Sequence, residues 1–94
     1  MSAAHTVTSA AGVPRHNLEV RIRSSQGAIL LARYDQAYEL PEVAAFIWRR
    51  IDGTTPVADI AGAVAERYGI DGPTALSDTV DMLAWLVEEK LVFM

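Results

Sequence analysis

Three of the prolines in this 94-residue chain each stand at the start of a segment whose apolar residues recur at helical spacing. They are Pro41, Pro56 and Pro73. A proline has no backbone N–H and cannot continue a strand ladder or a helix interior, but its fixed φ suits the first helical turn. Thr55 stands just before Pro56 and is the predicted N-cap of the second helix. We therefore expect three helices, at 41–51, 56–68 and 74–89.

The residues before Pro41 have the patterns of short strands. Residues 18–23 alternate between apolar and charged side chains, which predicts a half-buried strand. Residues 28–34 are more continuously apolar and fit a central strand, and residues 37–40 fit a brief third one after an Asp35-Gln36 hairpin turn. Strands grouped before helices predict an α+β fold, with three short N-terminal antiparallel strands packed on three helices. The short connection between the second and third helices resembles a helix-turn-helix with strands attached.

The two ends of the chain carry weaker signals. Residues 1–16 are small, polar and aperiodic, so we expect a flexible tail there and a folded domain at 17–94. Residues 91–93 are apolar and fit either a last strand or a segment that packs back onto the core.

Composition argues against several classes of protein. There is no cysteine, which excludes disulfides, thiolate metal sites and cysteine nucleophiles. The two histidines, His5 and His16, lie in or near the tail, and no carboxylate pair, Ser-His arrangement or Gly-rich phosphate loop is present. We therefore expect no enzyme, no metal and no cofactor. No secretory segment or apolar run of ~18–20 residues occurs, so we expect a cytoplasmic protein.

The third expected helix has two apolar stripes. At about 100° per residue, the first stripe is expected to face the core, and a mostly solvated face holds Asp78, Asp81, Trp85 and Glu88. Together the two stripes are wider than the apolar surface that one helix usually buries against the core of a small domain. The second stripe therefore faces a partner, unless the sheet and the other helices bury both stripes. The first stripe is Ala75, Thr79, Met82, Leu83 and Leu86, and the second is Leu76, Val80, Ala84 and Val87.

The stretch ELPEVAAFIWRRIDGTTPVADIAGAVAERYGI, followed by LSDTVDMLAWLVEEKLV, resembles protein D of pyrroloquinoline quinone biosynthesis (PqqD). It equally resembles the wider set of PqqD-like recognition elements for ribosomally made, post-translationally modified peptides. The shared features are a strand ending in Leu40, an Ile-Trp pair at 47–48, the Asp52-Gly53 turn and a closing Leu-Val at 91–92. Pro41 and Lys90 depart from residues that are common in relatives.

The resemblance implies a winged helix-turn-helix that binds peptide without catalysis. In such domains the leader segment of a precursor peptide adds as an extra strand beside the third strand, in a groove whose other wall is the third helix. The leader is then presented to a peptide-modifying enzyme, which in relatives is a radical S-adenosylmethionine enzyme, a leader protease or a cyclodehydratase. The peptide-binding residues expected here are Ala37, Tyr38, Glu39 and Leu40 on the strand and Leu76, Val80, Ala84 and Val87 on the helix.

Two other functions compete with peptide binding. A DNA-binding winged helix needs basic or amide side chains on its recognition helix, whereas residues 74–89 hold four acids and no Lys, Arg, Asn or Gln. We therefore expect no nucleic acid partner, and no membrane. A dimerisation module that binds no leader would have much the same sequence, and a homodimer stays open.

Overall fold

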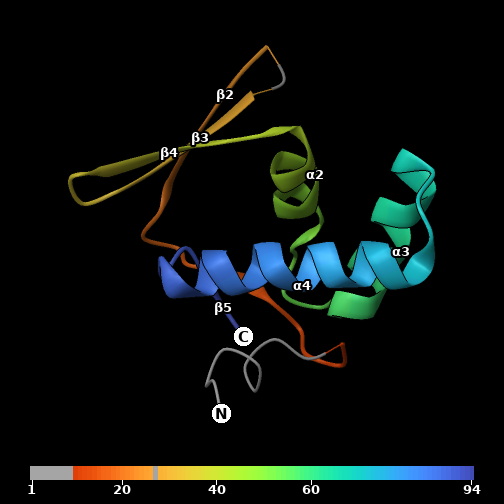
Figure 1. Ribbon diagram of the computed structural model, residues 1–94. Helices are drawn as coiled ribbons and strands as arrows, with labels where there is room; N and C mark the ends of the chain where they lie inside the picture. The colour runs from red at the N-terminus through yellow and green to blue at the C-terminus, as the bar shows by residue number, and fades with distance from the viewer. Residues whose placement is uncertain (1–9, 27) are drawn as a thin grey trace.

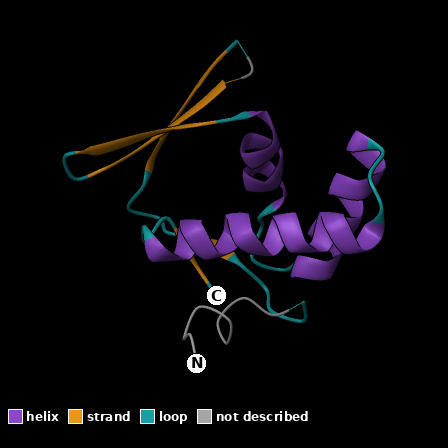
Figure 2. Cartoon of the chain, in the orientation of Figure 1, coloured by secondary structure: helices purple, strands orange, loops and turns teal. Residues whose placement is uncertain are grey.

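The computed structural model describes residues 10–26 and 28–94 and has the expected α+β architecture. A three-stranded antiparallel sheet projects to one side of three helices (Figure 1), and the helices gather on the other side (Figure 2). No helix among these residues is long and apolar enough to cross a membrane. The elements are β1 (Arg15–His16), β2 (Arg21–Ser25), β3 (Ala28–Arg33), β4 (Gln36–Leu40), α2 (Glu42–Arg50), α3 (Val57–Tyr68), α4 (Gly72–Glu88) and β5 (Val92–Phe93).

The sheet has the order β2-β3-β4, so that β3 is central. Arg33 pairs with Gln36, which leaves Tyr34 and Asp35 as the two-residue turn, one position earlier than expected. Tyr34 has a φ of +55°, a left-handed conformation that is uncommon for a residue with a side chain. The alternation on β3 and β4 turns one face of the sheet toward the helices, and that face buries Ile29, Leu31 and Leu40.

The expected strand at 18–23 was wrong at its start. Asn17 forms a turn there: its carbonyl accepts from the Val20 N–H at 3.1 Å, and its Oδ1 accepts from the Glu19 N–H at 3.0 Å. The turn moves the strand start to Arg21 and leaves Leu18 95% exposed. The alternation of residues 18–23 predicts Leu18 on the buried face of the strand. That pattern does not reveal the side-chain hydrogen bond of Asn17, which turns the chain here.

Residues 10–16 belong to the folded domain and not to a flexible tail. The carbonyls of Ala10 and Gly12 accept from the first free N–H groups of α3, at Ala58 (3.0 Å) and Val57 (2.9 Å). These bonds satisfy donors at the helix N-terminus, where Pro56 is the N-cap and no side chain caps the helix. The predicted Thr55 cap was therefore wrong. The rest of the expected tail, residues 1–9, lies outside the described residues.

The N-terminal segment is completed by a two-stranded sheet. β1 pairs antiparallel with β5, so that of the two alternatives expected for residues 91–93 the structure has the strand, at 92–93. The His16 ring stacks on the buried Trp48 ring with centroids 3.9 Å apart, and its Nε2 lies 3.0 Å from the Trp48 carbonyl oxygen. β1 is thus joined both to β5 and to α2.

α4 lies along α3 and contributes the expected core stripe. Its first turn is capped by Asp71, whose carboxylate accepts from the Thr74 N–H at 3.0 Å. Four of the five residues expected to face the core are buried, while Met82 is only half-buried. The buried four are Ala75, Thr79, Leu83 and Leu86.

The turn between α2 and α3 is expected to make the stability of the fold depend on pH in the acidic range. Asp52 accepts from the backbone N–H groups of Thr54 (2.9 Å) and Thr55 (2.8 Å), and these bonds hold the pKa of Asp52 down at about 2. A lowered folded-state pKa gives stability that is present above the ordinary carboxyl pKa of about 4 and is lost as pH falls toward 2. In urea titrations from pH 5 to 2, we expect Asp52→Asn to flatten this decline, and an unchanged decline would contradict the assignment.

Candidate functional site

The outer edge of β4 is open. Among the described residues, β4 pairs with β3 on one side and with no strand on the other. Residues that flank a two-residue turn form a mutually hydrogen-bonded pair, and such pairs then alternate along the ladder. The register therefore directs the N–H and C=O groups of Ala37 and Glu39 away from β3.

Pro41 sets the length of this edge. It occupies the next outward position but has no N–H, and its carbonyl already accepts from the Ala45 N–H at 2.8 Å in the first turn of α2. The open edge therefore offers the backbone groups of two residues, Ala37 and Glu39, before the chain becomes helical. A short edge with a charged side chain is typical of natural proteins that avoid uncontrolled pairing.

One face of β4 lies against α4. The Tyr38 hydroxyl donates to Glu89 Oε1 at 2.8 Å, and the Tyr38 ring meets Trp85 edge to face with centroids 5.6 Å apart. The hydrogen bond to Glu89 and then burial raise the pKa of Tyr38 above its ordinary value. Leu40 is buried in the core, whereas Ala37 and Glu39 are exposed on the other face. These contacts hold β4 at a fixed position relative to α4.

A groove of about 390 Å³ continues from this contact between α2 and α4. Its apolar lining is Val43 and Ile47 from α2 and Met82 and Trp85 from α4, and its charged lining is Asp78 and Asp81.

The helix stripe expected in the site lies elsewhere. At about 100° per residue, Leu76, Val80, Ala84 and Val87 are on the flank of α4 roughly opposite to Trp85 and Glu89, which meet β4. All four are half-buried, and three of them pack against the core. Of the expected strand residues, the structure therefore brings Tyr38 against Trp85 and Glu89, and it does not bring the four-residue stripe to β4.

Sequence reasoning missed the residues that line the groove. The sequence pattern predicts Met82 in the core and Trp85, Asp78 and Asp81 on a solvated face. The signal that could have found them is the recurrence of large apolar and acidic side chains at 78, 81, 82 and 85, the i, i+3, i+4, i+7 spacing of one helix face.

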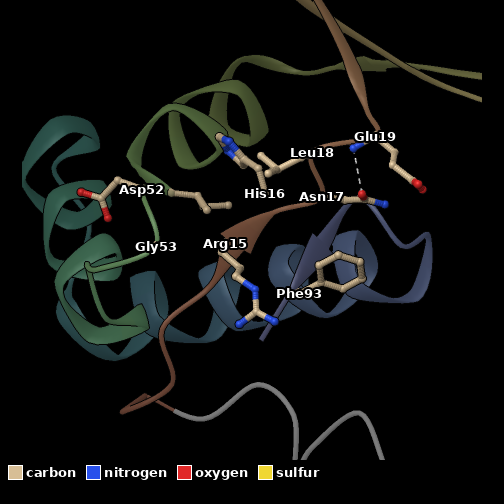
Figure 3. A pocket seen from close by; sticks show the side chains of 9 residues that line it. Arg15, His16, Asn17, Leu18, Glu19, Asp52, Gly53 and Phe93 are labelled. Atoms are coloured by element: carbon tan, nitrogen blue, oxygen red, sulfur yellow. Dashed lines mark hydrogen bonds between the residues drawn. The ribbon is translucent and has the colours of Figure 1, made fainter.

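A larger hollow of about 650 Å³ lies between β1, β5 and the α2–α3 turn (Figure 3). Its lining includes Arg15, Asp52 and Phe93, and no residue of the lining comes from β4 or α4. It is therefore separate from the open strand edge. Among the described residues, no group of three or more His, Cys, Asp or Glu side chains could hold a metal ion.

Solved structures show the same fold. The solution structure of a PqqD truncation of Methylobacterium extorquens PqqCD, described as a functional, stand-alone recognition element for ribosomally synthesised and post-translationally modified peptides, superposes with a TM-score of 0.78 at 25% identity. That alignment covers 95% of this chain and 97% of the other.

Two leader-peptide complexes have the same fold at lower identity. TbiB1 bound to the TbiA(beta) leader peptide gives a TM-score of 0.76 at 21% identity, covering 83% of this chain and 93% of that one. A lasso peptide synthetase B1 complexed with the leader peptide gives a TM-score of 0.76 at 19% identity, and the alignment covers 86% of this chain and 98% of that one.

Comparison with families gives a direct assignment. No curated protein matches the chain significantly. The family described as coenzyme PQQ synthesis protein D (PqqD) matches residues 27–92, from the start of β3 to β5. Since this match spans well over half of the chain and agrees with the fold, the protein belongs to the PqqD family.

Proposed function

We propose that this protein is a non-catalytic peptide-binding protein. It binds the leader segment of a ribosomally made precursor peptide as an added strand on β4 and presents the peptide to a tailoring enzyme. The observation that carries the proposal is the open β4 edge beside the Tyr38–Trp85 contact, because an unpaired edge next to a groove is what strand addition requires. Membership of the PqqD family and the leader-bound relatives support it.

The energetics suit reversible capture. Ala37 and Glu39 can exchange up to four hydrogen bonds with an added strand, each contributing ~1 kcal/mol net. One or two leader side chains buried against α4 add about 1.5–3 kcal/mol each. Ordering the leader and joining two molecules cost several kcal/mol. The balance is a few kcal/mol in favour of binding, which corresponds to millimolar to micromolar affinity, so that the peptide can be bound and then released to the enzyme.

A substitution at Trp85 tests which side of α4 contacts the leader peptide. A fluorescein-labelled peptide is made from the leader of a short precursor reading frame sought beside the gene, and titrating it should give saturable binding by anisotropy. Trp85→Ala removes a partly exposed aromatic ring beside β4. We expect it to weaken leader binding about tenfold, which is typical of the loss of a buried aromatic residue at an interface.

Val80→Ala is the matched control, since it removes apolar atoms from the opposite flank of the same helix. We expect its affinity to stay within about twofold of wild type. The reverse pattern would return the site to the stripe at 76, 80, 84 and 87. An absence of saturable binding to the wild-type protein would contradict the proposed function itself.

A further inference from the structure

The groove between α2 and α4 combines an apolar floor with an acidic rim. Ile47 is fully buried at the floor, whereas Val43 and Trp85 keep 38% and 36% of their surfaces exposed. Half-buried Met82 also lines the groove, and its flexible thioether side chain adapts to the shape of a neighbour. The floor therefore leaves large apolar surfaces open to a further apolar side chain.

The charge at the rim is of one sign. Asp78 and Asp81 line the groove and are exposed, and α4 carries no basic residue in its last turn. Residues 51–94 hold eight acids against two basic residues, a balance of −6. A groove with low-dielectric walls and acids of one sign favours a cationic ligand over a neutral or anionic one.

The groove is continuous with the open edge of β4. Trp85 lines the groove and also contacts Tyr38, the central residue of β4. Val43 lines its other wall and follows Leu40, the last residue of β4, by three positions. A peptide paired with Ala37 and Glu39 that continues past Pro41 therefore reaches the groove next.

We infer that the leader segment flanking the β4-bound strand is apolar and basic. One large apolar side chain fills the groove between Val43, Met82 and Trp85, and a neighbouring Lys or Arg of the leader meets the carboxylates of Asp78 and Asp81. An arginine at this place also reaches the face of Trp85. This inference rests on the proposed function and specifies the class of leader that the site selects.

Charge reversal tests the inference. The labelled leader peptide is titrated against wild-type protein, Asp78→Asn/Asp81→Asn and Asp81→Lys. Loss of a partly exposed ion pair should weaken binding about three- to tenfold in the double variant, and the like charge of Asp81→Lys should weaken it further. Replacing each leader Lys and Arg in turn by Glu should identify one peptide whose binding to Asp81→Lys is restored.

The matched control is Asp59→Asn/Glu66→Gln, which changes the net charge equally on α3, away from the groove, and should bind as wild type does. Normal leader binding by Asp78→Asn/Asp81→Asn would overturn the inference and leave the proposed function standing. No binding by the wild-type protein would overturn both. A dimer seen by sedimentation and lost in Asp81→Lys would assign the groove to a second copy of the chain and overturn the inference.

Discussion

Replacing Glu39 with proline is expected to reduce leader affinity by about ten- to a hundredfold while the protein stays folded. The Glu39 N–H points away from β3, so proline removes no bond of the sheet. It does remove one bond to an added strand and places its ring where that strand would lie. The combined loss is about 1.5–3 kcal/mol of binding free energy, measured by anisotropy with the labelled leader.

Two variants isolate the backbone effect. Glu39→Ala removes the same side chain but keeps the N–H, and we expect it to bind within about threefold of wild type. Ser24→Pro removes an outward N–H from β2, the other free edge of the sheet, and should leave binding unchanged. Weak binding by Ser24→Pro together with normal binding by Glu39→Pro would move the site to β2.

Trp48→Ala is expected to lower the free energy of unfolding by about 3–5 kcal/mol. Trp48 is 2% exposed and holds together three parts of the molecule: the core under α2, the stacked His16 ring and the β1–β5 sheet. Domains of this size have about 5–15 kcal/mol of stability in total, so the variant should lose a large fraction of it. Urea denaturation followed by circular dichroism measures the change.

The contribution of the ring stack is separable from that of the core. Trp48→Phe keeps an aromatic ring and should lose less than half as much stability as Trp48→Ala. His16→Ala removes the stacked ring alone, with an expected loss of about 0.5–1.5 kcal/mol. A loss below about 1 kcal/mol in Trp48→Ala would show that the N-terminal segment is not tied to the core through this residue.

The features of the fold that were predictable from the sequence are the local ones. Pro41, Pro56 and Pro73 marked the helix starts to within about two residues, because proline restricts its own backbone whatever surrounds it. Gly69 ends α3 in the left-handed conformation, with φ at +64°, as a C-terminal cap requires. The end of the strand at Leu40 could be predicted because a proline follows it, and its role as an open edge was implied by the family resemblance.

The features that were not predictable depend on contacts between distant residues. The carbonyls of Ala10 and Gly12 cap α3 across more than forty positions, and no local pattern indicates such a bond. Leu18 alternates correctly for a strand but is turned outward by Asn17, whose Nδ2 donates to the Lys90 carbonyl at 2.8 Å.

The face of α4 that meets β4 was also not predictable from the sequence. The buried stripe is flanked on one side by the apolar stripe at 76, 80, 84 and 87 and on the other by the face with Trp85 and Glu89. Only the position of Tyr38 shows which of these two flanks meets β4. The candidate site was therefore half predictable: its strand followed from the residues at 37–40, and its helix wall required the fold.

Amide hydrogen exchange on the leader complex tests the central claim most directly. An added strand on β4 predicts that the amides of Ala37 and Glu39 exchange rapidly in the free protein and become protected when the leader is bound. The outward amides of Ile22 and Ser24 on β2 should exchange at the same rate in both states. Protection of Ile22 and Ser24, with Ala37 and Glu39 unchanged, would contradict the account.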